Sequence, residues 1–198
     1  MSEAEKAGMR FIFPPSGKQQ PGPPAERHRR FCELDLPYPE PRVAAPNRYY
    51  AELLLEDYAG PRSELTAIHQ YIYHDFTFHE EHPELAELEK CISIVEMRHL
   101  ELLAGTILLL GADPRFWFIR ENRPVYWNAS FPYYGENVCD RLAADIAAEE
   151  GAIEQYRAHR KAIKDPYIDE LLHRIILDEE HHLRLFTEAY NKHCHDER

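Results

Sequence analysis

The sequence predicts an all-α protein, a four-helix bundle with a long crossover between its second and third helices and a Pro-rich N-terminal arm. Three observations support this prediction. Apolar residues recur with helical periodicity in four long segments, helix-breaking residues separate these segments, and a Glu-containing motif occurs twice at nearly equal spacing. The 198 residues suit one domain, which we place at residues 47–190, between an arm at 1–46 and a polar tail at 191–198.

The N-terminal arm is rich in proline, which favours extended backbone and removes hydrogen-bond donors. We expect its first part to be disordered. Residues 31–46 also carry apolar side chains that can pack, namely Phe31, Leu34, Leu36 and Tyr38. Two interpretations of this stretch stay open, a linker or an ordered arm that packs on the bundle or on a partner subunit.

Capping and breaking residues give the helix boundaries. Asn47 suits the N-cap of a short first helix, Gly111 suits a C-terminal stop, and Asp165 followed by Pro166 suits another N-terminus. The expected helices span residues 49–58, 61–78, 83–110, 136–163 and 166–190. The last four form two antiparallel hairpins, and these hairpins make up the bundle.

Residues 112–135 form a long connection that is rich in Phe, Trp and Tyr. Loops of this length are usually functional or serve as crossovers. The second and third bundle helices must run parallel if the two hairpins are to face each other, so a crossover along the bundle is required. Its aromatic surface predicts packing on the bundle or on another subunit, and hence a homo-oligomer, either a dimer or larger.

Two of the bundle helices carry a Glu-x-x-His pair, Glu96 with His99 and Glu179 with His182. Residues three apart lie on one face of a helix, so each pair points a carboxylate and an imidazole in the same direction. Glu96 and His99 also lie on the apolar stripe of their helix. Burying a charge without a partner is costly, so a cation must compensate these groups.

Each pair has an upstream glutamate, Glu64 at a separation of 32 residues and Glu149 at a separation of 30 residues. That distance corresponds to one helix out, a turn, and one helix back. Alignment of the two halves selects Glu149 over its neighbour Glu150, and His182 over its neighbour His181. Both neighbours stay open as alternatives.

Four carboxylates and two imidazoles in a four-helix bundle are the donor set of a carboxylate-bridged dimetal core. These donors suit two divalent ions, Fe or Mn. Two such ions would neutralise four carboxylates and so offset the cost of burying them. We expect Glu96 and Glu179 to bridge the ions, Glu64 and Glu149 to bind one each, and His99 and His182 to cap one each.

Three further residues are candidates for orienting these ligands. Asp178 precedes Glu179 and can accept a hydrogen bond from an imidazole, although its counterpart in the other half is Val95. Tyr71 and Tyr156 each lie seven residues, or two helical turns, beyond an upstream glutamate. Each tyrosine either donates to a ligand carboxylate or packs in the core.

The net charge and the cysteines limit which partners and which cellular compartment we expect. A net charge of −12 argues against nucleic acid as a partner, since binding phosphate needs clustered Lys and Arg. The longest apolar run, Ile107–Leu110, is too short to span a membrane, and no secretory signal is visible. The four cysteines form no Cys-x-x-Cys and fit a reducing cytoplasm better than a disulfide framework. The His-containing tail at residues 193–198 either binds metal or is a frayed polar end.

The paired Glu and Glu-x-x-His motifs resemble those of the ferritin-like superfamily, and within it the rubrerythrin and manganese catalase group. Residues 58–67, 96–103 and 175–182 look most similar to its CotJC-type, spore-coat-associated branch. The resemblance covers residues 47–190 and implies two Fe or Mn ions that react with hydrogen peroxide or dioxygen. In manganese catalases one carboxylate of this set can act as a base, and Glu179 is the residue for which we expect this catalytic role.

The resemblance predicts an oxidoreductase that acts on peroxide, with catalase-like or peroxidase-like chemistry. Rubrerythrins carry a rubredoxin domain with two Cys-x-x-Cys motifs, and this sequence has none, so a peroxidase reaction would need an external electron donor. Two alternatives stay open. One is a ferroxidase or another iron-handling protein, and the other is a structural, coat-associated metal-binding protein.

Overall fold

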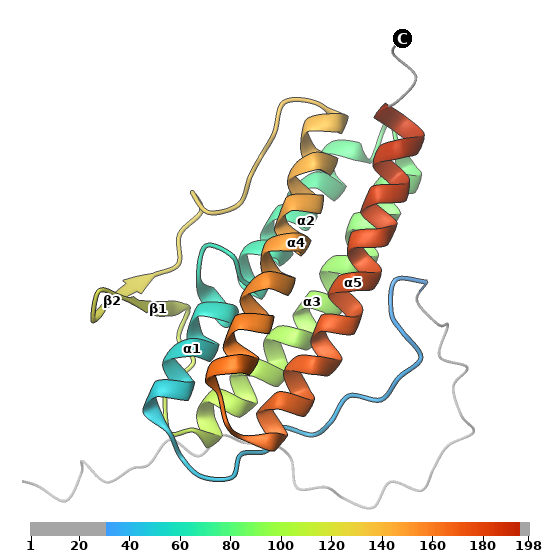
Figure 1. Ribbon diagram of the computed structural model, residues 1–198. Coiled ribbons are helices and arrows are strands. Elements are labelled where there is room, and N and C mark those ends of the chain that lie inside the picture. Colours follow the sequence, from blue (N-terminus) through green and yellow to red (C-terminus); the bar gives the residue numbers. More distant parts are fainter. Residues whose placement is uncertain (1–30, 195–198) are drawn as a thin grey trace, which may run out of the picture.

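The computed structural model describes residues 31–194, which form a bundle of long helices with a small hairpin at its side (Figure 1). The expectation of disorder in the first part of the arm therefore lies outside the described residues, as do the last four residues of the tail. The elements are α1 (Arg48–Ala59), α2 (Glu64–Phe78), α3 (Pro83–Leu109), β1 (Trp117–Arg120), β2 (Arg123–Tyr126), α4 (Val138–Ala162) and α5 (Pro166–Cys194).

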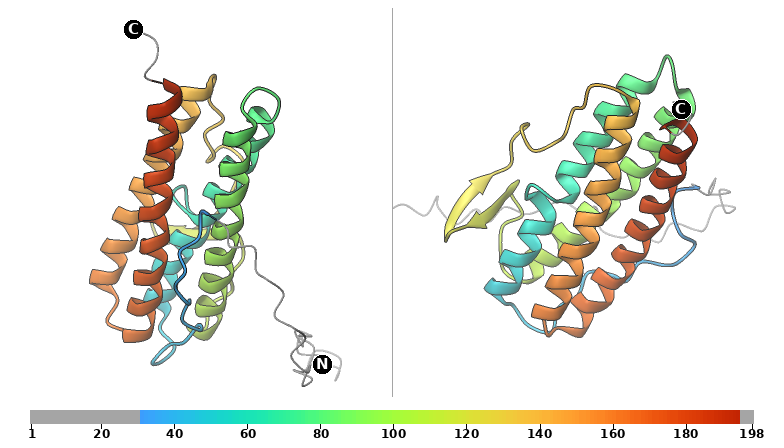
Figure 2. Two further views of the ribbon diagram at one scale, coloured as in Figure 1. Left: turned by 90° about the vertical axis from the view of Figure 1, so that its right-hand side faces the viewer. Right: turned by 45° about the horizontal axis from the view of Figure 1, so that its top comes forward.

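The four long helices are arranged as two antiparallel hairpins, α2 with α3 and α4 with α5. Helices α3 and α4 run in the same direction, and the crossover between them returns along the bundle (Figures 1 and 2). This arrangement is the predicted one. In the described part of the chain, no helix is long and apolar enough to cross a membrane.

The predicted capping residues occupy the positions expected for them. Asn47 accepts a hydrogen bond from the backbone N–H of Tyr50 at 3.1 Å, and Asp165 accepts one from that of Tyr167 at 3.0 Å. Gly111 has a φ of +90°, which glycine adopts without strain, directly after α3. Helix α5 extends to Cys194, four residues further than the apolar pattern indicated.

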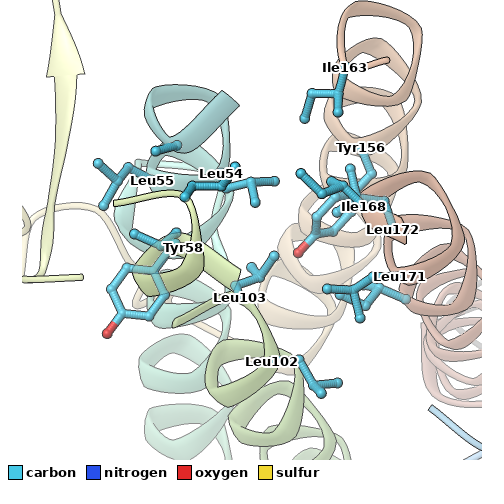
Figure 3. Packing of buried hydrophobic residues seen from close by; sticks show 14 of the residues in the cluster. Leu54, Leu55, Tyr58, Leu102, Leu103, Tyr156, Ile163, Ile168, Leu171 and Leu172 are labelled. Atoms are coloured by element: carbon cyan, nitrogen blue, oxygen red, sulfur yellow. The ribbon is translucent and has the colours of Figure 1, made fainter. Parts of the chain in front are cut away.

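Two apolar clusters fill the bundle and leave a polar layer between them. One cluster joins α1 to the C-terminal half of α3 and the N-terminal half of α5, and Figure 3 shows part of it, including Leu54, Leu103 and Leu171. The other lies toward the opposite end and includes Phe78, Ile92 and Phe186. The buried carboxylates lie on helix segments between these two clusters.

The crossover contains a two-stranded antiparallel hairpin that the sequence pattern did not reveal. Its two-residue turn, Glu121 and Asn122, has φ values of 51° and 59°. Positive φ at both positions suits the right-handed twist of a hairpin, but Asn-Gly is the usual sequence signal for such a turn. Further along, the indole of Trp127 donates to Thr66 at 3.0 Å and fixes the crossover to α2.

The four cysteines form two disulfides, Cys32 with Cys91 and Cys139 with Cys194. The expectation of unpaired cysteines was therefore wrong. The partners are 59 and 55 residues apart in the sequence, and only folding brings them together, so their spacing carried no signal. Cysteine usage consequently gives no support to the expected reducing compartment.

Residues 31–46 pack on the bundle along α3 and α5, as the blue segment in Figure 2 shows. The Arg174 guanidinium donates to the backbone carbonyl of Leu36 at 3.0 Å, and Asp165 accepts from the backbone N–H of Ala44 at 2.7 Å. Of the two interpretations of this stretch, the structure shows the ordered arm. The disulfide from Cys32 to α3 holds its beginning in place.

Candidate metal centre

The six residues of the repeated motif converge in the polar layer of the bundle. Their side chains are all buried, and they form two groups of four whose nitrogen and oxygen atoms lie within 4.8 Å of one another. Glu96 and Glu179 belong to both groups. The other members are Glu64 and His99 in the first group, and Glu149 and His182 in the second.

The two imidazoles lie on either side of the shared carboxylates. His99 Nδ1 is 2.8 Å from Glu96 Oε2 and 3.2 Å from Glu179 Oε1. His182 Nδ1 is 2.9 Å from Glu96 Oε1 and 3.4 Å from Glu179 Oε2. The Glu-x-x-His spacing brings this about, because residues three apart lie on one face of α3 and of α5.

The neighbours that the repeat alignment rejected lie outside this cluster. Glu149 is buried, whereas Glu150 is exposed on α4. The ring of His181 contacts the backbone carbonyl of Phe31 at 3.0 Å and faces the arm.

The outer nitrogen of His99 is held by two groups. His99 Nε2 lies 3.1 Å from Asp178 Oδ2 and 3.3 Å from the Tyr38 hydroxyl, which also donates to Asp178. Arg174 Nη1 lies 2.6 Å from the same Asp178 oxygen. Burial raises the pKa of Asp178, but His99, Arg174 and Tyr38 outweigh it and lower the pKa to about 2. The aspartate is thus an anion that accepts the Nε2–H of His99.

The outer nitrogen of His182 is held by the backbone of the arm. His182 Nε2 donates to the carbonyl oxygen of Cys32 at 3.1 Å. The repeat counterpart of Asp178 is the apolar Val95, so a carbonyl from the arm takes the place of the missing carboxylate. With both Nε2 atoms engaged, both Nδ1 atoms face the shared carboxylates, and each would offer its lone pair to a metal ion once its proton is lost.

Sequence reasoning missed the contributions of Tyr38 and Cys32. Both residues lie in the Pro-rich arm, outside the internal repeat that identified the other residues. The only signal was the presence of apolar side chains, Tyr38 among them, in a stretch otherwise dominated by proline.

The two tyrosines donate crosswise between the helices. Tyr71 of α2 donates to Glu149 of α4 at 2.6 Å, and Tyr156 of α4 donates to Glu64 of α2. Both rings are also fully packed. Two roles were left open for each tyrosine, donation to a ligand carboxylate or packing in the core. Both hydroxyl groups donate to a carboxylate, while the rings pack in the core.

Burial and charge set the protonation of the upstream glutamates in the absence of metal. Burial raises the pKa of Glu64 and of Glu149 well above the ordinary value, and the charges of Glu179 and Glu96 raise both further. Each of these upstream carboxyl groups therefore keeps its proton to a higher pH than an ordinary glutamate does.

The Glu-x-x-His pairs behave in the opposite way. Burial raises the pKa of Glu96 and of Glu179, but the two histidines outweigh it, so both pKa values lie below the ordinary value. Burial lowers the pKa of His182, and Glu96 and Glu179 outweigh it and raise the pKa to about 9. The pKa of His99 is likewise raised well above its usual range. Two carboxylates and two imidazolium ions thus balance each other.

Three buried polar atoms of this centre have other ligand atoms as their neighbours but make no well-directed hydrogen bond. They are Glu96 Oε1, Glu179 Oε1 and His182 Nδ1. Native proteins rarely leave buried polar atoms unpaired, and bound metal ions would supply the partners that these three atoms lack. The donor set, its burial and these unpaired atoms all fit a pair of bound divalent metal ions.

A cavity of about 330 Å³ reaches the centre between α2 and α4. Small residues of α4, including Ala144 and Ala148, line its wall, and the carboxylates of Glu64 and Glu149 lie in it. Its size admits a molecule such as hydrogen peroxide. The opposite side of the centre is covered by the arm.

The His-containing tail is described only to Cys194. His193 lies near His82 and Glu84 at one end of the bundle, and its Nε2 is 3.4 Å from Glu84 Oε1. These side chains are partly or largely exposed. The remaining tail residues lie outside the described range, and metal binding by the tail stays a prediction.

Comparisons with known proteins point to two kinds of relative. Residues 34–121 match the profile of a family described as manganese containing catalase. A probable manganese catalase from Clostridium acetobutylicum is 27% identical over 172 residues, covering 76% of this chain and 74% of the relative. A bacterioferritin from Streptomyces coelicolor is 31% identical over 125 residues, covering 61% of this chain and 69% of the relative.

Solved structures show the same two kinds. A manganese catalase from Anabaena matches with a TM-score of 0.72 and 26% identity, covering 81% of this chain and 79% of that one. The Desulfovibrio desulfuricans bacterioferritin, described with a diiron site, matches with a TM-score of 0.63 and 28% identity, covering 75% of this chain and 82% of that one.

Proposed function

Because this chain belongs to the ferritin-like superfamily, with homologues among manganese catalases and bacterioferritins, we propose that it is a dimetal oxidoreductase acting on hydrogen peroxide. One observation carries the proposal. Two groups of buried donors interlock through two shared carboxylates, and both imidazoles turn their Nδ1 atoms toward these carboxylates.

The proposed ligands are the six residues of the repeated motif. Glu96 and Glu179 would bridge two divalent ions, since each belongs to both groups. Glu64 and His99 would complete the coordination of one ion, and Glu149 and His182 would complete that of the other. Carboxylate and imidazole donors suit Mn and Fe alike.

When bound, two such ions supply the two-electron change that interconverts peroxide with water or dioxygen. The chain's own residues prepare the site for this chemistry. Tyr71 and Tyr156 hold the terminal carboxylates, while Asp178 and the Cys32 carbonyl fix the imidazole tautomers. The cavity between α2 and α4 gives peroxide a path, and the arm covers the other side, where Tyr38 and Cys32 contact the two histidines.

Glu179 is the proposed catalytic base. Its Oε1 makes no well-directed hydrogen bond, so this oxygen could take a proton from peroxide once bound metal replaces the histidine protons that lower the pKa of Glu179. Glu96 is less suited, because it lies between both imidazoles at 2.8 Å and 2.9 Å. The alternative is that the same Glu179 oxygen stays bound to metal during the whole reaction. Glu179 would then be a metal ligand and not a base.

Catalase-like disproportionation suits this chain better than peroxide reduction. Two molecules of hydrogen peroxide yield two of water and one of dioxygen, so no outside reductant is consumed. The sequence has no Cys-x-x-Cys that could hold a rubredoxin-type iron. Peroxidase chemistry would require an external electron donor.

Iron handling is the second candidate, and the bacterioferritin relatives favour it. The same six donors would then bind Fe²⁺ and support its oxidation by dioxygen or peroxide. A coat-associated structural role and a cytoplasmic location stay predictions from the sequence.

We further propose that the chain forms a homo-oligomer. The crossover leaves large aromatic side chains exposed, among them Phe116, Tyr126 and Tyr133 at 51%, 58% and 48%. Exposed apolar surface of this kind often marks an association site.

The test combines elemental analysis with an assay of oxygen release from peroxide, using protein purified without chelator. Manganese at about two ions per chain with oxygen release supports the catalase proposal. Iron without oxygen release supports iron handling. The variant Glu149→Gln should lose metal from the dimetal centre together with activity, whereas Glu150→Gln, which changes the exposed neighbour, should keep both. Absence of metal after reconstitution with either ion would overturn both candidates and leave the structural role.

A further inference from the structure

A second buried polar cluster lies on three of the same helices, beyond the dimetal centre. His74 of α2, Glu89 of α3 and Asp145 of α4 are each 0% exposed. His74 follows Glu64 by ten residues, Glu89 precedes Glu96 by seven, and Asp145 precedes Glu149 by four. At 1.5 Å per residue these offsets place the cluster about 10 Å along the bundle from the dimetal centre.

Neighbouring polar groups orient the histidine of this cluster. His74 Nε2 lies 2.9 Å from the carbonyl oxygen of Tyr133, which can only accept, so Nε2 carries a proton. His74 Nδ1 lies 3.0 Å from Asp145 Oδ2. The Gln70 amide donates to Asp145 Oδ1 at 2.8 Å. A carbonyl thus fixes Nε2, as it often fixes the non-ligating nitrogen of a metal-bound histidine, and Nδ1 faces the carboxylate of Asp145, 2.9 Å from Oδ1.

Glu89 is the observation that points to a ligand. Both of its carboxylate oxygens are buried without a hydrogen-bond partner among the described residues. Its polar neighbour Asp145 is another carboxylate, and the ligand atoms of the three residues lie within 4.8 Å of one another. Burial raises the pKa of Glu89, and the charges of Asp145 and Asp75 raise it further. Leaving such a group unpaired is costly.

We propose that His74, Glu89 and Asp145 form a mononuclear site for a divalent transition-metal ion, separate from the dimetal centre. One imidazole nitrogen and two carboxylates suit Mn²⁺, Fe²⁺ or Zn²⁺. The three donor atoms lie within 4.8 Å of one another, so small side-chain adjustments would bring each of them to about 2 Å from a common ion. The ion would tie α2, α3 and α4 together and, through Tyr133, anchor the end of the crossover.

The competing explanation is a proton. Glu89 would then be neutral and would share its proton with the neighbouring Asp145, whose charge raises the pKa of Glu89. That arrangement satisfies one Glu89 oxygen at most and leaves the other buried without a donor. A metal ion can bind both oxygens of Glu89 together with His74 and Asp145. It would therefore give every one of these buried polar side chains a partner.

The test loads the full-length, metal-depleted protein with Mn²⁺ alone and removes free ion by desalting. Manganese is then counted by elemental analysis, and its electron paramagnetic resonance spectrum is recorded. We expect the wild type to hold one ion more per chain than Glu89→Gln and to show the six-line signal of isolated Mn²⁺. Glu87→Gln, which changes an exposed residue two positions away, should match the wild type.

A second variant keeps the test decisive if Glu89→Gln fails to fold. Glu96→Gln removes a shared carboxylate of the dimetal centre, and it should retain one ion per chain with the six-line signal. Equal manganese in the wild type and Glu89→Gln, or no ion in Glu96→Gln, would overturn the inference. Oxygen release reports on the dimetal centre separately, so a protein with the extra ion but no oxygen release would contradict only the proposed function.

Discussion

Loading of the dimetal centre should release about four protons per pair of ions. The perturbation is the addition of Mn²⁺ to metal-free protein at pH 7. Without metal, burial raises the pKa values of Glu64 and Glu149 and favours their protonated forms, while Glu96 and Glu179 raise those of His99 and His182 and favour imidazolium ions. A ligand must be deprotonated to bind, so two carboxyl groups and two imidazoles each give up one proton.

The same count fixes the pH dependence of affinity. Each group has a raised pKa in the metal-free protein, so its proton competes with metal below that pKa and ceases to compete above it. With about four protons released, the constant for binding both ions should rise about 10⁴-fold per pH unit. The slope should fall as the pH rises past the pKa of each group, and His182, with a pKa of about 9, should cease to contribute its one proton above pH 9.

The assay is isothermal titration calorimetry in buffers that differ in ionisation enthalpy, at pH 7. The Glu89→Gln variant is used, so that the proposed mononuclear site does not contribute. Glu64→Gln should lower the count by about one proton, and the exposed control Glu150→Gln should leave it unchanged. Release of two protons or fewer would refute the reasoning, because the two buried carboxyl groups would then already be ionised.

Three further predictions concern the arm and the access path. Tyr38→Phe removes the hydroxyl that donates to Asp178 and should weaken Mn²⁺ binding about tenfold; an unchanged affinity in a metal titration would contradict this role. Cys32→Ser opens a disulfide that spans 59 residues, and it should lower the free energy of unfolding by about 4 kcal/mol in denaturant melts. A reducing agent should destabilise the wild type in the same way, and a difference between the two proteins that persists after reduction would contradict this assignment. Ala148→Leu should narrow the cavity and lower kcat/KM for peroxide, whereas Ala143→Leu, on an exposed face of α4, should not. Equal rates in the two alanine variants would place the access path elsewhere.

Much of the bundle could be predicted because its signals are local. The apolar periodicity of α2 to α5 reports which face of each helix is buried, and Asn47 and Asp165 cap their helices through residues two or three positions away. The hairpin at residues 117–126 was missed, since its turn residues Glu121 and Asn122 lack the usual sequence signal.

The sequence by itself determined the six convergent donors. Two Glu-x-x-His pairs, each on an apolar stripe, can satisfy their burial only by facing one another across the bundle. Helical geometry and the two nearly equal separations are sufficient to bring Glu64, Glu96 and Glu179 to one level, and no long-range contact needs to be known.

Only the tertiary structure decided what surrounds these donors. The Cys32 carbonyl and the Tyr38 hydroxyl reach the two histidines from an arm that has no periodicity, and the disulfides join residues more than fifty positions apart. The triad of His74, Glu89 and Asp145 belongs to three helices and to no repeat. Such contacts form between segments that are distant in the sequence. A periodic pattern within one segment reports which of its faces is buried, but not which distant residue will contact it.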